Sequence, residues 1–199
     1  MRKFIVAALL AGSFAAPAMA QDAAPAPADN GFGGFRIEAI AGFDRIKVPD
    51  AHTDGAVYGV GAGYDFNAGN MVLGIEGEAS DSTGDDCATA VIRAGDRLCA
   101  KAGRDLYIGG RVGAVLGTST LIYAKAGYTN ARLRLEYDAN LAGTTGDFLT
   151  RANYDGLRVG AGVEQKLGTN AFVKAEYRYS NYENDLEKHQ GVIGVGFRF

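Results

Sequence analysis

The chain ends in GVIGVGFRF, residues 191–199, and this stretch alternates between two kinds of side chain. Successive side chains of a β-strand point to opposite faces, so Ile193, Val195, Phe197 and Phe199 share one apolar face. The opposite face carries Val192, two glycines and one charge, Arg198. Chain termini usually fray into solvent. An apolar strand that ends on an aromatic residue therefore indicates an apolar environment around it.

Seven further segments alternate in the same way, which predicts an all-β chain of eight strands. They are FRIEAIAGF (35–43), YGVGAGYDF (58–66), LGIEGEAS (73–80), LYIGGRVGA (106–114), IYAKAGY (122–128), LRVGAGVE (157–164) and FVKAEYRYS (172–180). Three short links, at 67–70, 117–120 and 167–170, alternate with longer polar links at 44–54, 81–104, 137–153 and 183–190. We therefore expect tight turns at one end of the structure and long loops at the other.

The polar faces of these segments carry balanced charge, with six basic and six acidic residues at mid-strand positions. They are Arg36, Arg111, Lys125, Arg158, Lys174 and Arg178 against Glu38, Asp65, Glu76, Glu78, Glu164 and Glu176. A soluble sandwich or lipocalin would turn these charges to water. Balanced charge and abundant glycine, 29 of 199 residues, better suit a narrow lumen filled by paired side chains. The sequence predicts a closed eight-stranded antiparallel transmembrane up-and-down β-barrel over residues 35–199.

The N-terminal stretch MRKFIVAALLAGSFAAPAMA has the form of a secretory signal peptide, residues 1–20. A basic start precedes an apolar run that is too short for a retained membrane helix. The small residues Ala18 and Ala20 predict cleavage before Gln21. Residues 21–34 are rich in Ala and Pro, and we expect a flexible N-terminal segment.

The charge of the chain gives no reason to expect nucleic acid as a partner. Without Arg2 and Lys3 of the leader, 18 basic residues stand against 23 acidic ones, a difference of −5. No cofactor and no metal site is expected. The two cysteines, Cys87 and Cys99, lie in the longest link, and a secreted context with an even count favours a disulfide between them. Free or metal-binding thiols are the alternative.

The chain resembles the small eight-stranded outer-membrane barrels of the opacity-protein and OmpA-barrel type in Gram-negative bacteria. The residues that carry the resemblance are the signal peptide, VGAGYDF (60–66) with VGAGVEQ (159–165), KAEYRYSNY (174–182) and GVIGVGFRF (191–199). The resemblance implies an outer-membrane location and a C-terminal assembly signal at Ile193, Val195, Phe197 and Phe199. It also implies periplasmic chaperones and the barrel-assembly machinery as partners during biogenesis.

The function expected from the sequence is non-enzymatic: a structural, monomeric envelope protein with a salt-bridged closed lumen and four extracellular loops. A surface adhesin and a narrow porin-like channel are the alternatives. Acyl chemistry needs a nucleophile with a general base, typically His. Some eight-stranded outer-membrane barrels act on lipid A, and the lipid A deacylases carry a His-x-Ser motif. The chain has only His52 and His189, and neither matches this motif.

One irregularity interrupts the alternation after Tyr128. Leu133 and Leu135 alternate with Arg132 and Arg134, with the apolar residues now at odd positions. A β-bulge, or an extension of the hairpin above the membrane, would account for the change. Arg132 and Arg134 would then meet the phosphates of lipopolysaccharide.

Overall fold

The computed structural model describes residues 31–48, 51–89, 97–138, 148–183 and 186–199, and these residues form nine β-strands. The strands are β1 (Gly34–Val48), β2 (Ala51–Ala68), β3 (Met71–Ser82), β4 (Asp85–Thr89), β5 (Arg97–Leu116), β6 (Thr120–Asp138), β7 (Phe148–Leu167), β8 (Ala171–Tyr182) and β9 (Leu186–Arg198). Within the described ranges, no helix is long and apolar enough to cross a membrane.

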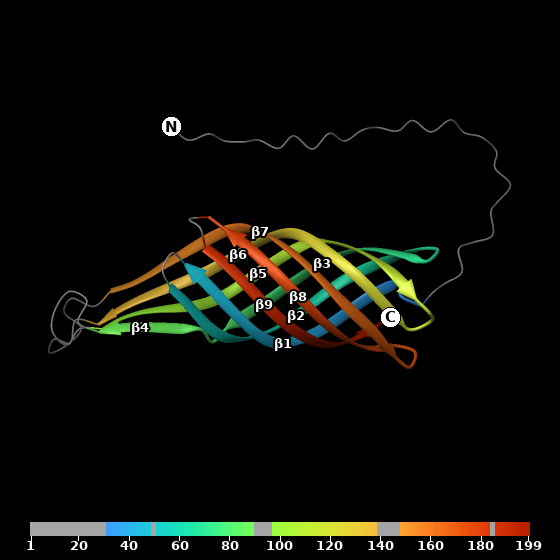
Figure 1. Cartoon of the computed structure of the whole chain (residues 1–199), viewed down its shortest axis with the longest axis horizontal. Helices are drawn as coiled ribbons and strands as arrows, with labels where there is room; N and C mark the ends of the chain where they lie inside the picture. Colours follow the sequence, from blue (N-terminus) through green and yellow to red (C-terminus); the bar gives the residue numbers. More distant parts are fainter. Residues whose placement is uncertain (1–30, 49–50, 90–96, 139–147, 184–185) are drawn as a thin grey trace, which may run out of the picture.

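Eight of the strands close into an antiparallel barrel (Figure 1). The sheet runs in the order β3-β2-β1-β9-β8-β7-β6-β5-β4, and an additional pairing between β3 and β5 closes the ring. The short strand β4 continues beyond β3 along the same neighbour, β5, and lengthens the wall at one end. Closure pairs every barrel strand on both sides, which a strand in hydrocarbon requires. The predicted fold class is confirmed.

The two ends of the barrel differ as the link lengths predict. The three tight turns each contain a glycine in the left-handed region, with φ of 64° at Gly69, 66° at Gly117 and 74° at Gly168. An L-residue is strained in this conformation, so glycine favours the reversal. The C-terminus and the start of β1 lie at this turn end, and β4 lies at the opposite, loop end (Figure 1).

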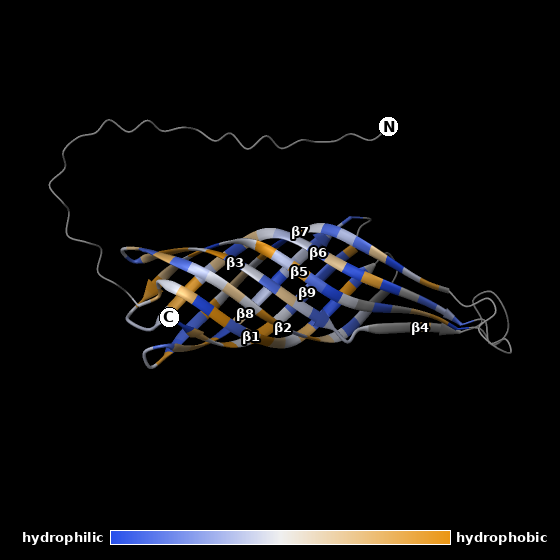
Figure 2. Ribbon diagram, turned by 180° about the vertical axis from the view of Figure 1, so that it is seen from behind, coloured by the Kyte–Doolittle hydropathy of each residue, from blue (hydrophilic) through white to orange (hydrophobic). Residues whose placement is uncertain are grey.

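The apolar face of each barrel strand points outward, and the charged face points inward. Figure 2 shows the resulting alternation of hydrophobic and hydrophilic residues along the strands. The exposed outer residues include Phe43, Tyr58, Ile108, Leu157 and Ile193. A soluble protein rarely exposes so large a contiguous apolar area, whereas a barrel wall in lipid must do so. The faces therefore have the orientation that the sequence predicts for a membrane barrel.

The apolar alternation of β6 changes after Tyr128, but β6 itself contains no bulge there. β6 runs without interruption to Asp138, and Arg132 and Arg134 lie on the same outer side as Tyr128. The register shift is in the neighbouring strand β5, between Ala102 and Asp105. Above the apolar band the surroundings change from lipid to water, so the outer face becomes polar without any change of backbone phase. The predicted hairpin extension is present, and the bulge lies in β5.

The N-terminal segment enters the barrel at the turn end. Phe32 is fully buried in an apolar cluster: Phe32, Val72, Val115, Leu121 and Tyr123. The Arg198 guanidinium donates a hydrogen bond to the Phe32 carbonyl, and Lys166 Nζ lies 4.7 Å from the centre of the Phe32 ring. The flexible segment predicted over 21–34 is thus wrong for residues 31–34, because Phe32 finds an apolar site inside the barrel mouth. Residues 21–30 lie outside the described ranges.

Candidate functional site: the charged interior and the loop-end surface

The barrel interior holds equal numbers of buried acidic and basic side chains in the described part of the chain. The bases are Arg36, Arg111, Lys125, Arg158, Lys174, Arg178, Lys188 and Arg198, and the acids are Glu38, Asp44, Asp65, Glu76, Glu78, Asp105, Glu164 and Glu176. Each of the sixteen lies within 4.0 Å of at least one group of opposite charge. Eight positive and eight negative charges leave the interior neutral, which a low-dielectric site demands.

Near the turn end, two arginines and two carboxylates form a ring of ion pairs. Arg111 donates two hydrogen bonds to Asp65, at 2.8 and 2.6 Å, and a third to Glu164 at 3.0 Å. Arg198, from the last strand, donates to the same two carboxylates at 2.7 Å each. Forked guanidinium–carboxylate contacts of this kind are the strongest side-chain hydrogen bonds. The ring links β2, β5, β7 and β9 across the barrel.

Two lysines bridge carboxylates at the middle of the barrel. Lys125 Nζ lies 2.9 Å from Glu76 and 2.8 Å from Glu176. Lys174 Nζ lies 2.6 Å from Glu38 and 3.4 Å from Glu176. The five groups come from β1, β3, β6 and β8, and all of these pairs except Lys174–Glu176 join strands that are not neighbours in the sheet.

Near the loop end, Asp105 is the centre of a third group. Arg158 Nη2 lies 2.5 Å from Asp105, Tyr182 donates its hydroxyl to it at 2.9 Å, and Lys188 Nζ lies at 3.4 Å. Lys188 also lies 3.2 Å from Asp44. In addition, Arg178 pairs with Glu78. Each interior acid in this region thus lies close to a base.

The structure places all twelve residues of the predicted charge network in the interior, with ion pairs. Sequence reasoning missed Asp44 and Lys188 because they fall in the predicted links 44–54 and 183–190. It also left Asp105 and Arg198 out as strand-end residues. The alternation of faces could have identified both residues. Phe43 points outward, so Asp44, the next residue, points inward, and Lys188 is an even number of residues from Arg198 and shares its inner face. Strands β1 and β9 both extend toward the loop end beyond the last residues of their apolar outer face.

The two cysteines form a disulfide between β4 and β5. Cys87 and Cys99 are direct partners in the strand pairing, with their Cα atoms 4.1 Å apart. The bond fastens the tip of the hairpin at the loop end. In the described ranges, no group of three or more His, Cys, Asp or Glu side chains is arranged to hold a metal ion.

The last strand presents the predicted assembly residues to the outside of the barrel. Ile193, Val195, Phe197 and Phe199 are all exposed on the outer face. The Phe199 amide donates to the Phe35 carbonyl at 2.8 Å, and the two rings lie 6.2 Å apart. The end of the chain is therefore part of the wall. Their role as an assembly signal stays a prediction, and the cleavage residues Ala18, Ala20 and Gln21 lie outside the described ranges.

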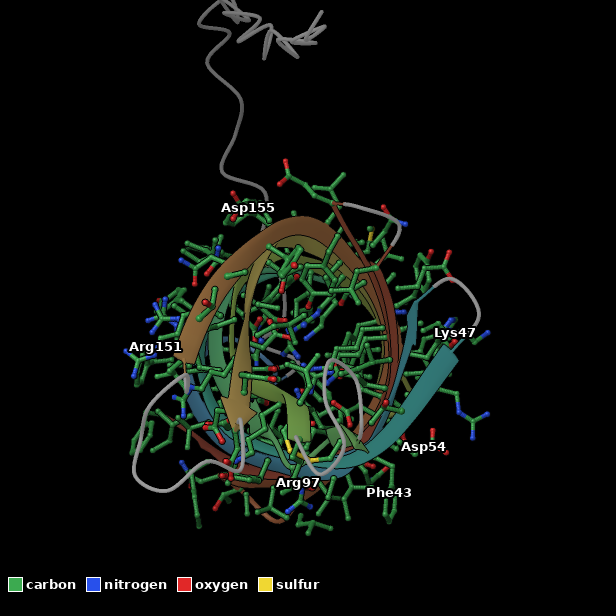
Figure 3. The ribbon with its side chains drawn as sticks, turned by 90° about the vertical axis from the view of Figure 1, so that its left-hand side faces the viewer. Phe43, Lys47, Asp54, Arg97, Arg151 and Asp155 are labelled. Atoms are coloured by element: carbon green, nitrogen blue, oxygen red, sulfur yellow. A yellow bond between two sulfur atoms is a disulfide. The ribbon has the colours of Figure 1, made fainter. Side chains whose placement is uncertain are left out.

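The outer surface above the apolar band is mostly polar, although Leu149 is exposed there. Arg45 donates two hydrogen bonds to Asp54, at 2.6 and 2.9 Å, and these raise the pKa of the Arg45 guanidinium. Hydrogen bonds from Tyr128 and then Asn130 lower the pKa of the Asp155 carboxyl. Figure 3 shows Asp54 and Asp155 pointing away from the barrel. These paired groups mark the level where lipid gives way to water.

His189 does not lie in a loop, as the sequence suggested, but on the outer face of β9. Its Nδ1 lies 2.7 Å from the Tyr177 hydroxyl, and the Tyr179 ring lies 5.0 Å from the imidazole. Two tyrosines thus surround the imidazole. Of His52, only its place in β2 is described.

A closed barrel with an apolar outer face and a neutral ionic interior defines an integral β-barrel protein of a membrane. The chain matches the family described as "Outer membrane protein beta-barrel domain" over residues 6–199, and it belongs to this family. The protein is therefore an outer-membrane protein, as predicted.

Two relatives carry outer-membrane names. The chain is 30% identical over 141 residues to the 25 kDa outer-membrane immunogenic protein of Brucella ovis, covering 71% of this chain and 62% of that protein. It is 28% identical over 183 residues to the 22 kDa outer membrane protein of Rhizobium leguminosarum bv. viciae, covering 89% and 77%.

A solved structure shares the fold. The attachment invasion locus protein of Yersinia pestis, Ail, crystallised with the heparin analogue sucrose octasulfate, matches with a TM-score of 0.58 at 16% identity. The match covers 84% of this chain and 99% of that chain.

Proposed function

We propose that this protein is a non-enzymatic structural component of the outer membrane, with a barrel closed by its own side chains. The observation that carries the proposal is the neutral set of eight bases and eight acids buried in the interior of the described residues. An eight-stranded barrel has an interior just wide enough for side chains to fill. Ion pairs that cross the lumen, such as Lys125 to Glu176 at 2.8 Å, occupy this width.

The orientation of the barrel belongs to the same proposal. Outer-membrane barrels have short periplasmic turns and longer extracellular loops. The turn end, with Gly69, Gly117 and Gly168, would face the periplasm together with both termini, and four loops would face the cell exterior. A disulfide at the loop end suits an oxidising compartment. An epitope tag inserted within residues 139–147 should be detected on intact cells, whereas periplasmic detection only would reverse the orientation.

The non-enzymatic part of the proposal is supported by the state of the reactive groups. The interior carboxylates face arginine or lysine, and His189 contacts tyrosines on the outer face. Acyl transfer needs a base next to a nucleophile, and a glycosidase needs one protonated and one ionised carboxyl. We expect unchanged lipid A masses in an overexpressing strain, and a new lipid A species would instead indicate an enzyme.

The proposed function is tested by conductance in planar lipid bilayers. We expect no steady conductance from the reconstituted chain, with an open porin as positive control in the same membranes. A steady conductance of the unaltered chain would replace the structural role by that of a narrow channel. An unheated SDS gel of the same sample, in which a closed barrel migrates apart from its boiled form, checks that the inserted protein is folded.

The remaining partners follow from this location. Assembly would use periplasmic chaperones and the barrel-assembly machinery, with Ile193, Val195, Phe197 and Phe199 as the recognised strand. Lipopolysaccharide would surround the upper outer face. The barrel would act as a monomer, since closure pairs each of the eight barrel strands on both sides.

A further inference from the structure

A row of like charges crosses three strands on the outer surface near the loop end. Lys101 of β5 is the direct partner of Arg134 on β6, and Arg134 is the direct partner of Arg151 on β7. Arg134 and Arg151 are exposed, and Figure 3 shows Arg151 pointing away from the barrel. We call Lys101, Arg134 and Arg151 the basic row.

The basic row is under-neutralised within the described residues. Lys101 pairs with Glu136 at 2.5 Å, but Arg134 and Arg151 form no ion pair there. Like charges directly opposite each other destabilise a strand pair. The wall thus holds an unfavourable contact between Arg134 and Arg151 that a bridging anion would relieve.

Two more arginines extend the basic row toward the membrane. Arg132 lies two residues below Arg134 on β6 and donates to the Asn153 side chain at 3.0 Å. Arg104 is exposed in the β5 bulge, where the register skips the position opposite Arg132. The surface then carries five bases against two acids, Glu136 and Asp85, the β4 partner of Lys101, a net charge of +3. A hydrogen bond to a neutral side chain, such as that of Arg132 to Asn153, does not reduce this net positive charge.

The height of these residues selects the kind of anion. The outer apolar band ends on β6 at Tyr128, and Arg134 lies six residues further along the strand. At ~3.4 Å per residue and a tilt of ~40°, Arg132 lies ~10 Å and Arg134 ~15 Å above Tyr128. Headgroups extend only ~5–8 Å beyond the hydrocarbon. The phosphates of a phospholipid lie too low for Arg134, whereas the phosphorylated core sugars of lipopolysaccharide reach it.

We propose that Lys101, Arg104, Arg132, Arg134 and Arg151 form a binding surface for the phosphorylated core saccharide of lipopolysaccharide. The proposal rests on the orientation given above, with the loop end outside. It enlarges the pair Arg132 and Arg134, which the sequence suggests, to a site on three strands. Arginine is suited to it, because its planar fork binds phosphate through two hydrogen bonds.

The first test measures binding to rough lipopolysaccharide. The full chain is expressed with its leader, purified from outer membranes in zwitterionic detergent, freed of lipopolysaccharide, and titrated against immobilised rough lipopolysaccharide. The double variant Arg134→Gln/Arg151→Gln should bind ~25-fold more weakly, at about fivefold for each lost contact between an arginine and a phosphate. The matched control, Arg45→Gln/Lys47→Gln, loses the same charge on the outer face of β1 and should change binding less than twofold.

The ligand chemistry is tested with modified probes. Dephosphorylated rough lipopolysaccharide should bind the unaltered chain as weakly as the phosphorylated form binds Arg134→Gln/Arg151→Gln. Phosphatidylglycerol vesicles should bind the double variant and the unaltered chain alike. Binding of a sulfated polysaccharide without binding of rough lipopolysaccharide would overturn the proposal in favour of a glycan partner.

A second measurement separates a binding role from a structural one. Without lipopolysaccharide, the double variant should melt at the same temperature as the unaltered chain or above it, because the variant removes a repulsion. When lipopolysaccharide is added, the melting temperature of the unaltered chain should rise more than that of the double variant. Lower stability of the variant in both conditions, or equal lipopolysaccharide affinity, would overturn the site. A failed proposed function would instead appear in the conductance and tag experiments, which do not involve these arginines.

Discussion

Replacing Asp65 by asparagine tests whether the ionic interior stabilises the barrel. Asp65 accepts two hydrogen bonds from Arg111 and one from Arg198, and Arg36 Nε lies 3.2 Å away. Asparagine keeps the size of the side chain, removes the charge, and turns one acceptor into a donor facing a guanidinium. Seven acids would then face eight bases. Removing one partner of a buried ion pair costs about 3–5 kcal/mol, and with three arginines affected we expect about 4 kcal/mol.

The assay is equilibrium unfolding in urea of the chain refolded in detergent micelles, followed by far-ultraviolet circular dichroism because the chain has no Trp. The matched control Asp54→Asn breaks an exposed pair with Arg45, whose side chains are each 55% exposed, and should leave the midpoint unchanged. Adding Arg111→Gln to Asp65→Asn restores neutrality and should recover part of the loss. If Asp65→Asn unfolds at the same urea concentration as Asp54→Asn, the interior charges do not stabilise the fold.

Further predictions concern single positions. Gly127→Ala places a Cβ 2.5 Å from the Gly109 Cα and should cost about 1–3 kcal/mol in the same urea assay, whereas Gly191→Ala, with open space around it, should be neutral. Phe32→Ala empties the cluster at the turn end and should cost about 3 kcal/mol, and an unchanged midpoint would mean that Phe32 leaves the barrel in solution. Phe199→Ser should reduce the folded band on unheated gels of outer membranes while Phe199→Tyr retains it, and equal bands for both would remove the assembly role. Cys87→Ser should make the hairpin tip sensitive to protease without shifting barrel melting, so a lower melting temperature would contradict a purely local effect.

The barrel wall could be predicted from the sequence because its two environments differ so strongly. The outer face contacts lipid and the inner face contacts packed charged side chains. The polarity of each wall residue therefore indicates the face on which it lies. Ile193 and Arg198 could thus be assigned to opposite faces without a structure. The three turns with Gly69, Gly117 and Gly168 could also be predicted, from the short links between alternating segments.

The parts of the fold that could not be predicted lie where the two faces of the wall no longer differ in polarity. Above the apolar band both faces of the wall are polar or mixed, so Asp44 and Lys188 looked like loop residues. Strand β4, DDCAT, has no alternation of apolar and polar residues to recognise, although it pairs with β5 as a local hairpin. The burial of Phe32 could not be predicted for another reason. A single aromatic residue in an Ala- and Pro-rich segment forms no pattern that indicates where its side chain packs.

The unequal strand lengths connect the disulfide to the proposed lipopolysaccharide site. β5, β6 and β7 have 20, 19 and 20 residues, whereas β8 and β9 have 12 and 13, so the wall extends furthest on one side. The extended part has water on its outer face and gains little from lipid. Cys99 lies two residues from Lys101, and its bond to Cys87 fastens β4 to β5 at the level of the basic row. The disulfide would fix the register of β4 against β5, so that Lys101 faces Arg134 from a strand that is paired on both sides, and not from a loop.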